Sequence, residues 1–234
     1  ANPHYRFPSK GDAKSATFNA LLGLRRGMTR PLSQFIWGVA GTGKDAFIQR
    51  ISELTRSPCK VIQINPDLDI SKFLFSHEIC PIKGSYYKEG ELLKALRDGY
   101  TTESGKVIPY IIILTDLDRC TPQQGEHLRM ILDSVQGRIQ SPDGGIFHVM
   151  AGTRILATAN STGNGSSGGR YASSQVMDSS ILSRFVYTWE FKPLHWDDEE
   201  VVIRNKFPLL ARHCDSLFDA IGKATGILRK AVKD

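Results

Sequence analysis

The 234-residue sequence predicts an α/β fold with a parallel central sheet, followed by a short all-helical lid. A glycine-rich loop separates an apolar run from a helical pattern within 32–51, apolar runs alternate with helical patterns as far as Pro193, and only helical patterns follow. Strands that alternate with helices are typical of a parallel sheet covered on both faces. We therefore expect an α/β domain over 1–193, whose first part, 1–31, is an N-terminal extension, and a helical lid over 194–234.

The composition is that of a globular protein, with 41% hydrophobic and 23% charged residues. No stretch approaches the roughly 18 consecutive apolar residues of a membrane span, and the polar N-terminus does not resemble a secretory signal, so we expect a cytoplasmic protein with no membrane partner. The four cysteines are widely spaced, which favours reduced thiols over a metal site. A net charge of +6 suits a polyanion such as ATP or nucleic acid, but the basic residues are scattered, so nucleic acid stays an open possibility as a partner.

The first half of the chain contains the phosphate-loop region and two expected strands. A strand at 32–37 leads into the glycine-rich loop, and the apolar spacing of 46–51 predicts a helix. A second strand at 60–65 ends at Asn65-Pro66, because proline cannot continue a central strand. The remaining expectations are an amphipathic helix at 16–24, a short helix or loop at 67–75, an exposed loop at 84–90 and a helix at 91–97 that stops at Gly99.

The second half contains the most apolar run in the sequence, at 107–114. A β-branched run of that length, bounded by turn residues, predicts a strand buried on both faces. Further elements are expected as follows: a helix at 125–135, a hairpin at 138–149, a buried strand at 154–159, a flexible loop at 161–174, a helix at 176–184 and a strand at 185–191. Four acidic residues, Asp197 to Glu200, suit the first turn of a helix after Pro193.

Residues 38–45, Gly-Val-Ala-Gly-Thr-Gly-Lys-Asp, match the G-x-x-x-x-G-K part of a phosphate-binding loop between a strand and a helix. Backbone N–H groups, the helix N-terminus and Lys44 would together bind phosphate oxygens. We predict ATP and Mg²⁺ as cofactors. The predicted nucleotide-binding residues are Gly38, Val39, Ala40, Gly41, Thr42, Gly43, Lys44, Asp45 and Ala46. The eighth motif position, normally a Ser or Thr that ligates Mg²⁺, is Asp45.

With these motifs the chain resembles the AAA+ ATPases, within them the MoxR/CobS-like branch; CobS is the motor subunit of a cobalt chelatase. The residues that support the resemblance are Gly41 to Lys44, Gly90 to Gly99, Ala157 to Asn160, Gly163, Gly165, Tyr171, Gln175 and Ser183 to Phe185. The resemblance implies a three-layer P-loop fold with a helical lid. It also implies a homo-oligomeric ring, usually a hexamer, with ATP at the subunit boundaries and hydrolysis used to remodel a partner protein, including partners with a von Willebrand A-type domain.

The resemblance also implies roles for single residues. Lys44 would bind the β- and γ-phosphates, and Asn160 would orient the attacking water. Arg184 would be the finger that reaches the γ-phosphate of the neighbouring subunit, and Arg229 the lid sensor. The structural alternative is an ion pair for each arginine and a strand-end turn for Asn160.

The sequence departs from the family at its acidic motif, where Thr115-Asp116 stands in place of Asp-Glu. One interpretation is a reciprocal exchange in which Asp45 ligates Mg²⁺ and Thr115 hydrogen-bonds behind it, with Asp116 as the catalytic base near the metal. A second is that both positions have decayed. A third register makes Asp116 the metal-side acid and Leu117 the lost base.

Two functions from different classes follow. The first is a motor that hydrolyses ATP slowly, because the Asp116 carboxylate is one methylene shorter than a Glu and misplacement on the ångström scale costs about 10²-fold in rate. The second is a scaffold that binds nucleotide but hydrolyses little, and an ATPase that acts on a nucleic-acid complex is a further alternative. The insertion at 100–109 predicts an extra hairpin. The exposed Tyr86-Tyr87-Lys88 would either line a central pore or pack under a neighbouring helix.

Overall fold

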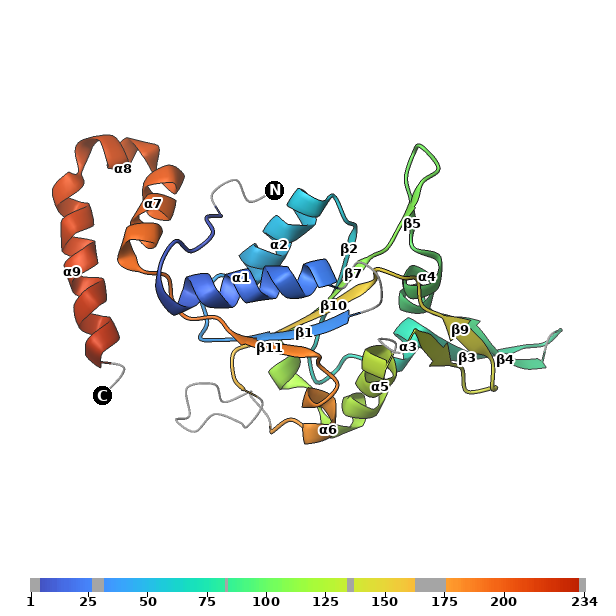
Figure 1. Cartoon of the computed structure of the whole chain (residues 1–234). Coiled ribbons are helices and arrows are strands. Elements are labelled where there is room, and N and C mark those ends of the chain that lie inside the picture. Colours follow the sequence, from blue (N-terminus) through green and yellow to red (C-terminus); the bar gives the residue numbers. More distant parts are fainter. Residues whose placement is uncertain (1–4, 27–31, 83, 134–136, 163–175, 232–234) are drawn as a thin grey trace.

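A computed structural model of the chain describes residues 5–26, 32–82, 84–133, 137–162 and 176–231. Its centre is a sheet of five parallel strands in the order β11-β1-β10-β7-β2. The strands are β1 (Leu32–Trp37), β2 (Cys59–Gln63), β7 (Ile111–Thr115), β10 (Arg154–Ala159) and β11 (Tyr187–Glu190). Non-consecutive neighbours in this order mean crossover connections, and the predicted α/β fold with a parallel central sheet is confirmed (Figure 1).

Alternate side chains of each central strand enter two separate cores. Ile36 packs with Phe47 and Ile113 on the face covered by α1 (Gly11–Arg26) and α2 (Lys44–Thr55). Phe35 and Ile112 pack in the larger core on the opposite face. The period-2 alternation of a strand therefore separates the molecule into three layers, as expected.

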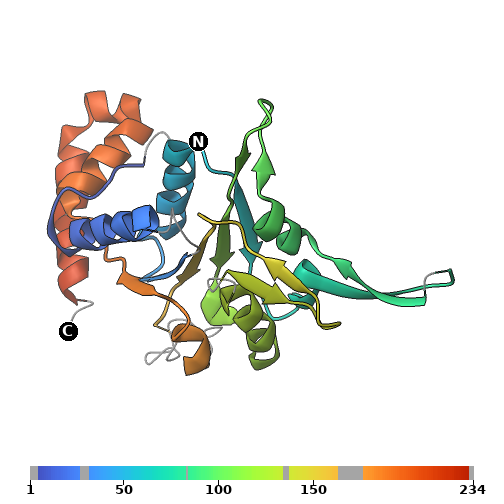
Figure 2. The same cartoon turned by 45° about the vertical axis from the view of Figure 1, so that its right-hand side comes forward.

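The larger core is closed by short helices. They are α3 (Ser71–Leu74), α4 (Glu91–Asp98), α5 (Pro122–Asp133) and α6 (Ser179–Leu182), with the 3₁₀ turn η1 (Leu117–Arg119). After Pro193 come α7 (Trp196–Lys206), α8 (Pro208–His213) and α9 (Asp215–Ala231). They lie at the side of the molecule opposite the hairpin of β3 (Phe75–Cys80) and β4 (Gly84–Glu89) (Figures 1 and 2). Among the described residues, no helix combines the length and apolar character needed to cross a membrane.

Three antiparallel hairpins extend beyond the central sheet: β3 (Phe75–Cys80) with β4 (Gly84–Glu89), β5 (Tyr100–Thr101) with β6 (Val107–Ile108), and β8 (Arg138–Gln140) with β9 (Ile146–His148). The predicted hairpins at 100–109 and 138–149 are confirmed. The exposed loop expected at 84–90 is wrong, because 84–89 pair with 75–80 as strand β4. Tyrosines favour strands, but the partner strand was not apparent in the sequence.

Two expected elements are shorter in the structure. The single strand expected at 107–114 is divided at Pro109, which has no N–H to donate to a ladder, into β6 and β7. The helix expected at 176–184 is a single turn, α6, in which the side chain of Asp178 at the N-cap accepts a hydrogen bond from the N–H of Ser180. The predicted loop at 161–174 lies outside the described residues from position 163 onward, as do Gly163, Gly165, Tyr171 and Gln175.

The N-terminal segment before α1 joins the C-terminal helix α7 to helix α2, which follows the glycine-rich loop. The buried Asp198 carboxylate of α7 accepts hydrogen bonds from the backbone N–H and the hydroxyl of Ser9, at 2.8 Å and 2.7 Å. Tyr5 and Phe7 pack edge to face on each other and against Phe47 of α2. Tyr5 also lies close to Gly43, so the segment runs beside the end of the glycine-rich loop.

Candidate functional site

The glycine-rich loop between β1 and α2 forms the base of the site. Gly41 and Gly43 have φ values of 85° and 83°, a left-handed conformation that costs other residues about 1–2 kcal/mol. A side chain on Gly38 is excluded for a different reason, because its Cβ would lie 2.1 Å from the carbonyl oxygen of Phe191. No side chain caps the N-terminus of α2 at Gly43, so its first N–H groups remain available for an anion.

Lys44 lies at the start of α2 and is 7% exposed. Its ammonium donates hydrogen bonds to the carbonyl oxygens of Gly38 (2.7 Å) and Val39 (3.2 Å), and to Oδ1 of Asn160 (3.1 Å). Burial lowers the pKa of this ammonium, and the neighbouring carboxylates oppose the shift. The cation is therefore held at the loop by three neutral acceptors that a phosphate would outcompete.

Asp45, the departure from the motif, faces the sheet. The hydroxyl of Thr158 in β10 donates to Oδ1 of Asp45 at 3.3 Å. Thr115 at the end of β7 lines a cavity of about 360 Å³ together with Asp45, and its own carbonyl accepts from the N–H of Ile64. The proposed exchange between Asp45 and Thr115 stays a prediction, to which the structure adds Thr158 as the hydroxyl that binds Asp45.

Asp116 follows β7 in a left-handed conformation, with φ of 55°. Aspartate tolerates this conformation better than most residues. Its Oδ2 accepts a hydrogen bond from Nε2 of Gln63 at 3.1 Å. Leu117, the other candidate in the alternative register, is fully buried in the larger core.

Several of the predicted residues line one cleft at the carboxyl ends of β1, β10 and β7. This cleft of about 350 Å³ is lined by Ala40, Gly41, Gly43, Lys44, Asp45, Ala46, Asp116, Thr158, Ala159 and Asn160. Ligands of open parallel sheets bind at this edge, where loops leave the strands. The sheet therefore brings together the loop, the acidic motif and Asn160, which are far apart in the sequence.

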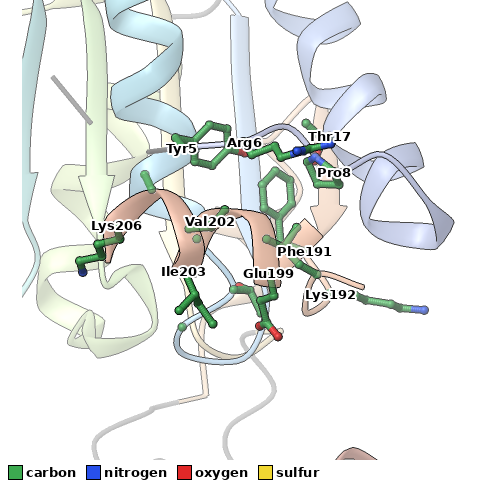
Figure 3. A pocket seen from close by; sticks show the side chains of 15 residues that line it. Tyr5, Arg6, Pro8, Thr17, Phe191, Lys192, Glu199, Val202, Ile203 and Lys206 are labelled. Carbon is green, nitrogen blue, oxygen red and sulfur yellow. The ribbon is translucent and has the colours of Figure 1, made fainter. Parts of the chain in front are cut away.

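A second pocket of about 250 Å³ continues from the loop and also contacts Gly41, Gly43 and Ala46. Figure 3 shows Tyr5 and Pro8 of the N-terminal segment on one side, the α7 residues Val202 and Ile203 on the other, and Phe191 between them. Burial raises the pKa of the Tyr5 hydroxyl above its usual range. An apolar pocket beside a phosphate loop has the chemistry that an aromatic base requires.

The two predicted arginines lie elsewhere and are paired. Arg184 donates from Nε to Asp133 (2.7 Å) and from Nη1 to the carbonyl of Ser180 (2.6 Å). Arg229 in α9 donates to the carbonyl of Leu194 (2.8 Å) and to Glu199 (2.7 Å). None of the described residues that line the Lys44 cleft is an arginine. Within one chain, therefore, neither Arg184 nor Arg229 reaches this cleft.

The oxygen donors of the cleft fit Mg²⁺. Asp45 and Asp116 both line it, and no group of three or more His, Cys, Asp or Glu side chains suited to a metal is found among the described residues. Magnesium is usually held by one or two carboxylates plus substrate phosphates, rather than by a cage of protein ligands. The donor set thus suits a metal that arrives with a nucleotide.

Sequence reasoning missed three contributors to the site: Thr158, Asp118 and Tyr5. Asp118 is 2% exposed, and its Oδ2 accepts from the N–H of Asn160 (3.1 Å) and the hydroxyl of Ser161 (3.2 Å). The sequence signal for Asp118 was its spacing of two residues from Asp116, next to an apolar Leu117. Thr158 lies within the motif Ala157 to Asn160, but its partner Asp45 is distant in the sequence and no role was assigned to it. No local signal marked Tyr5, because its partners lie in distant segments.

Comparisons with known proteins agree with the observed fold. Residues 33–185 match the family model described as an AAA domain of the dynein-related subfamily. A crystal structure of a protein described as a putative ATPase from Cytophaga hutchinsonii superposes with a TM-score of 0.52 at 16% identity, covering 83% of this chain and 51% of that chain, so this chain spans about half of its length. No curated protein matches. Since the family model covers more than half of the sequence, including the loop, the acidic motif and Asn160, this chain belongs to the dynein-related subfamily of AAA domains.

Proposed function

We propose that this protein hydrolyses ATP in a ring of identical subunits and uses the energy to remodel a partner protein. The observation that supports this most directly is the single cleft lined by Lys44, Asp116 and Asn160 beside the glycine-rich loop. A phosphate-binding cation, a carboxylate and a carboxamide are the groups needed to hold a γ-phosphate and orient a water against it. The apolar pocket under Tyr5 would take the adenine.

Each residue has a distinct role in the proposal. Lys44 would leave the carbonyls of Gly38 and Val39 for the β- and γ-phosphates. Asp116 would accept the proton of the attacking water, with the hydrogen bond from Gln63 fixing its carboxylate. Asp45 would ligate Mg²⁺, which when bound neutralises charge on the phosphates, while Thr158, and Thr115 behind it, orient this carboxylate.

The finer assignment is a MoxR/CobS-like motor, in a ring that is typically a hexamer. Arg184 is paired with Asp133 and does not line the cleft of its own chain, so a role in hydrolysis would require it to leave this pair and act at the cleft of a neighbouring subunit. Arg229, in the helical lid, would be the lid sensor. A partner with a von Willebrand A-type domain is part of this proposal.

Phosphate release with excess Mg²⁺ tests the activity. We expect measurable turnover in the parent chain and loss of about 10²-fold or more in Asp116→Asn, because an amide cannot take the proton. Asparagine tolerates the left-handed backbone, so the fold is kept. Asp67→Asn, which changes an exposed aspartate outside the cleft, is the matched control and keeps parental turnover. ATP binding without turnover in the parent would support the nucleotide-gated scaffold instead.

A mixing experiment tests the ring. Lys44→Ala and Arg184→Ala subunits are each inactive if both residues are needed at one boundary, and mixing them restores part of the activity, because some boundaries then contain both intact residues. Two inactive variants that stay inactive after mixing would contradict a role for Arg184 in the neighbouring site.

A DNA-binding measurement tests the nucleic-acid alternative. DNA binding that weakens steeply as the salt concentration rises would favour an ATPase that acts on a nucleic-acid complex.

A further inference from the structure

Asp118 is a buried carboxylate that the proposed reaction does not yet use. It lies in η1, the 3₁₀ turn immediately after β7, and is 2% exposed. Leu117 beside it is fully buried and anchors the turn in the larger core. The turn therefore directs Asp118 inward, under the carboxyl end of the neighbouring strand β10.

The backbone ladder between β10 and β7 ends before this point. Its last pair is Ala157 with Leu114, three residues before Asn160. Beyond the ladder, Oδ2 of Asp118 accepts a hydrogen bond from the N–H of Asn160 at 3.1 Å and from the hydroxyl of Ser161 at 3.2 Å. A side chain of the acidic motif thus takes over the hydrogen bonding where the strands separate.

The pair of hydrogen bonds that Asp118 accepts from Asn160 and Ser161 is called the Asp118 clamp below. Asn160 connects this clamp to the phosphate loop. Its backbone N–H is bound to Asp118, while its side-chain oxygen accepts from the ammonium of Lys44 at 3.1 Å. Asp118, Asn160 and Lys44 therefore form a continuous chain of hydrogen bonds from the acidic strand to the loop. Loss of the hydrogen bond between Asp118 and the backbone of Asn160 would therefore shift the side-chain carboxamide of Asn160.

We propose that Asp118 is a positioning residue, which fixes Asn160 so that its carboxamide meets the γ-phosphate and the attacking water. The inference rests on the proposed function, since it assigns Asp118 a part in the same reaction without contact to the substrate. A buried carboxylate has few other partners that compete for its hydrogen bonds, and charge-assisted hydrogen bonds are strong, so they fix the positions of the groups that donate them. Misplacement of a reacting or orienting group by about 1 Å costs up to about 10²-fold in rate.

The molecule supplies a matched control for this buried carboxylate. Asp198 is 1% exposed and accepts from the same two kinds of donor, the backbone N–H and the hydroxyl of Ser9. Its hydrogen bonds fasten the N-terminal segment to α7, away from Asn160. Loss of Asp198 therefore reproduces the removal of a buried acceptor without touching the Asn160 chain.

Amide hydrogen exchange of the nucleotide-free protein tests the contact itself. Asp118→Ala is expected to speed exchange at Asn160 by at least about tenfold, because its N–H loses a buried acceptor. Asp198→Ala is expected to speed exchange at Ser9 and not at Asn160. Asp118→Asn, whose carboxamide oxygen still accepts from both donors, is expected to restore slow exchange. Unchanged exchange at Asn160 in Asp118→Ala would overturn the proposal.

A double-mutant cycle tests the action through Asn160. Asp118→Ala is expected to lower kcat for ATP hydrolysis by about 10- to 100-fold and to reduce the preference for ATP over ADP, with little change in ADP affinity. In an Asn160→Ala background the same change should cost less than about twofold, since the group that it positions is gone. Fully additive losses would show a general structural role and overturn the proposal.

The two experiments separate this inference from the proposed function. A parent chain that does not hydrolyse ATP refutes the proposed function and, with it, the catalytic consequence of the clamp. The exchange experiment is independent of turnover. Faster exchange at Asn160 in Asp118→Ala still supports the positioning contact, and unchanged exchange refutes it.

Discussion

Replacement of Asp45 by Asn is the most informative single change in the cleft. The substitution keeps the side-chain volume and an acceptor for the Thr158 hydroxyl, which lies 3.3 Å from Oδ1, and it removes only the charge. A carboxylate about 5 Å from a phosphate charge, at an effective dielectric of about 20, is repelled by about 3 kcal/mol unless a cation lies between them. That energy corresponds to a difference of about 200-fold in affinity.

Calorimetric titration of ATP with excess Mg²⁺ and with EDTA measures this difference. We expect the parent chain to bind ATP about 10²-fold more weakly in EDTA, and Asp45→Asn to reduce this dependence by more than tenfold. Glu53→Gln, which removes a carboxylate from the last turn of the same helix, is the matched control and keeps the parental dependence. Equal parental affinities in EDTA and Mg²⁺, or the same ratio in Asp45→Asn, would refute Asp45 as a metal ligand.

The remaining predictions concern the exchange hypothesis and stability. Asp45→Thr alone should impair phosphate release, and adding Thr115→Asp should restore it; a double variant as poor as the single one would contradict the coupling. Gly38→Ala should lower Tm by about 4–10 °C, since its Cβ would lie 2.1 Å from a carbonyl oxygen. Gly226→Ala, whose Cβ on α9 would meet no atom within 4 Å, is the control and should not lower Tm. Equal Tm values for the two variants would count against the clash. Burial raises the pKa of the Cys120 thiol to about 11. Because the unfolded thiol ionises near pH ~8.5, the free energy of unfolding should fall as the pH rises from about 8.5 to about 11; urea unfolding should show a flatter dependence in Cys120→Ala, and identical profiles would exclude this thiol as the cause.

Local sequence determined the phosphate loop and the strands around it. The loop requires left-handed glycines at positions 41 and 43 followed directly by Lys44 and a helix, and those constraints act within a few residues. The central strands were equally readable, because a strand covered on both faces consists of consecutive apolar residues, as in 111–114. The fold class followed from these segments and their alternation with helices.

Only the tertiary structure decided how the cleft is assembled. Asp45 and Thr158 are 113 residues apart, and they meet because β10 lies between β1 and β7 in the sheet. Asp118 reaches Asn160 for the same reason, across 42 residues. Strand β4 was missed as well, since its pairing with β3 is a contact between segments rather than a property of either one. The sequence alone therefore determined which chemical groups this AAA domain offers to the proposed site, while the strand order, a product of long-range packing, decided which of these groups are in contact.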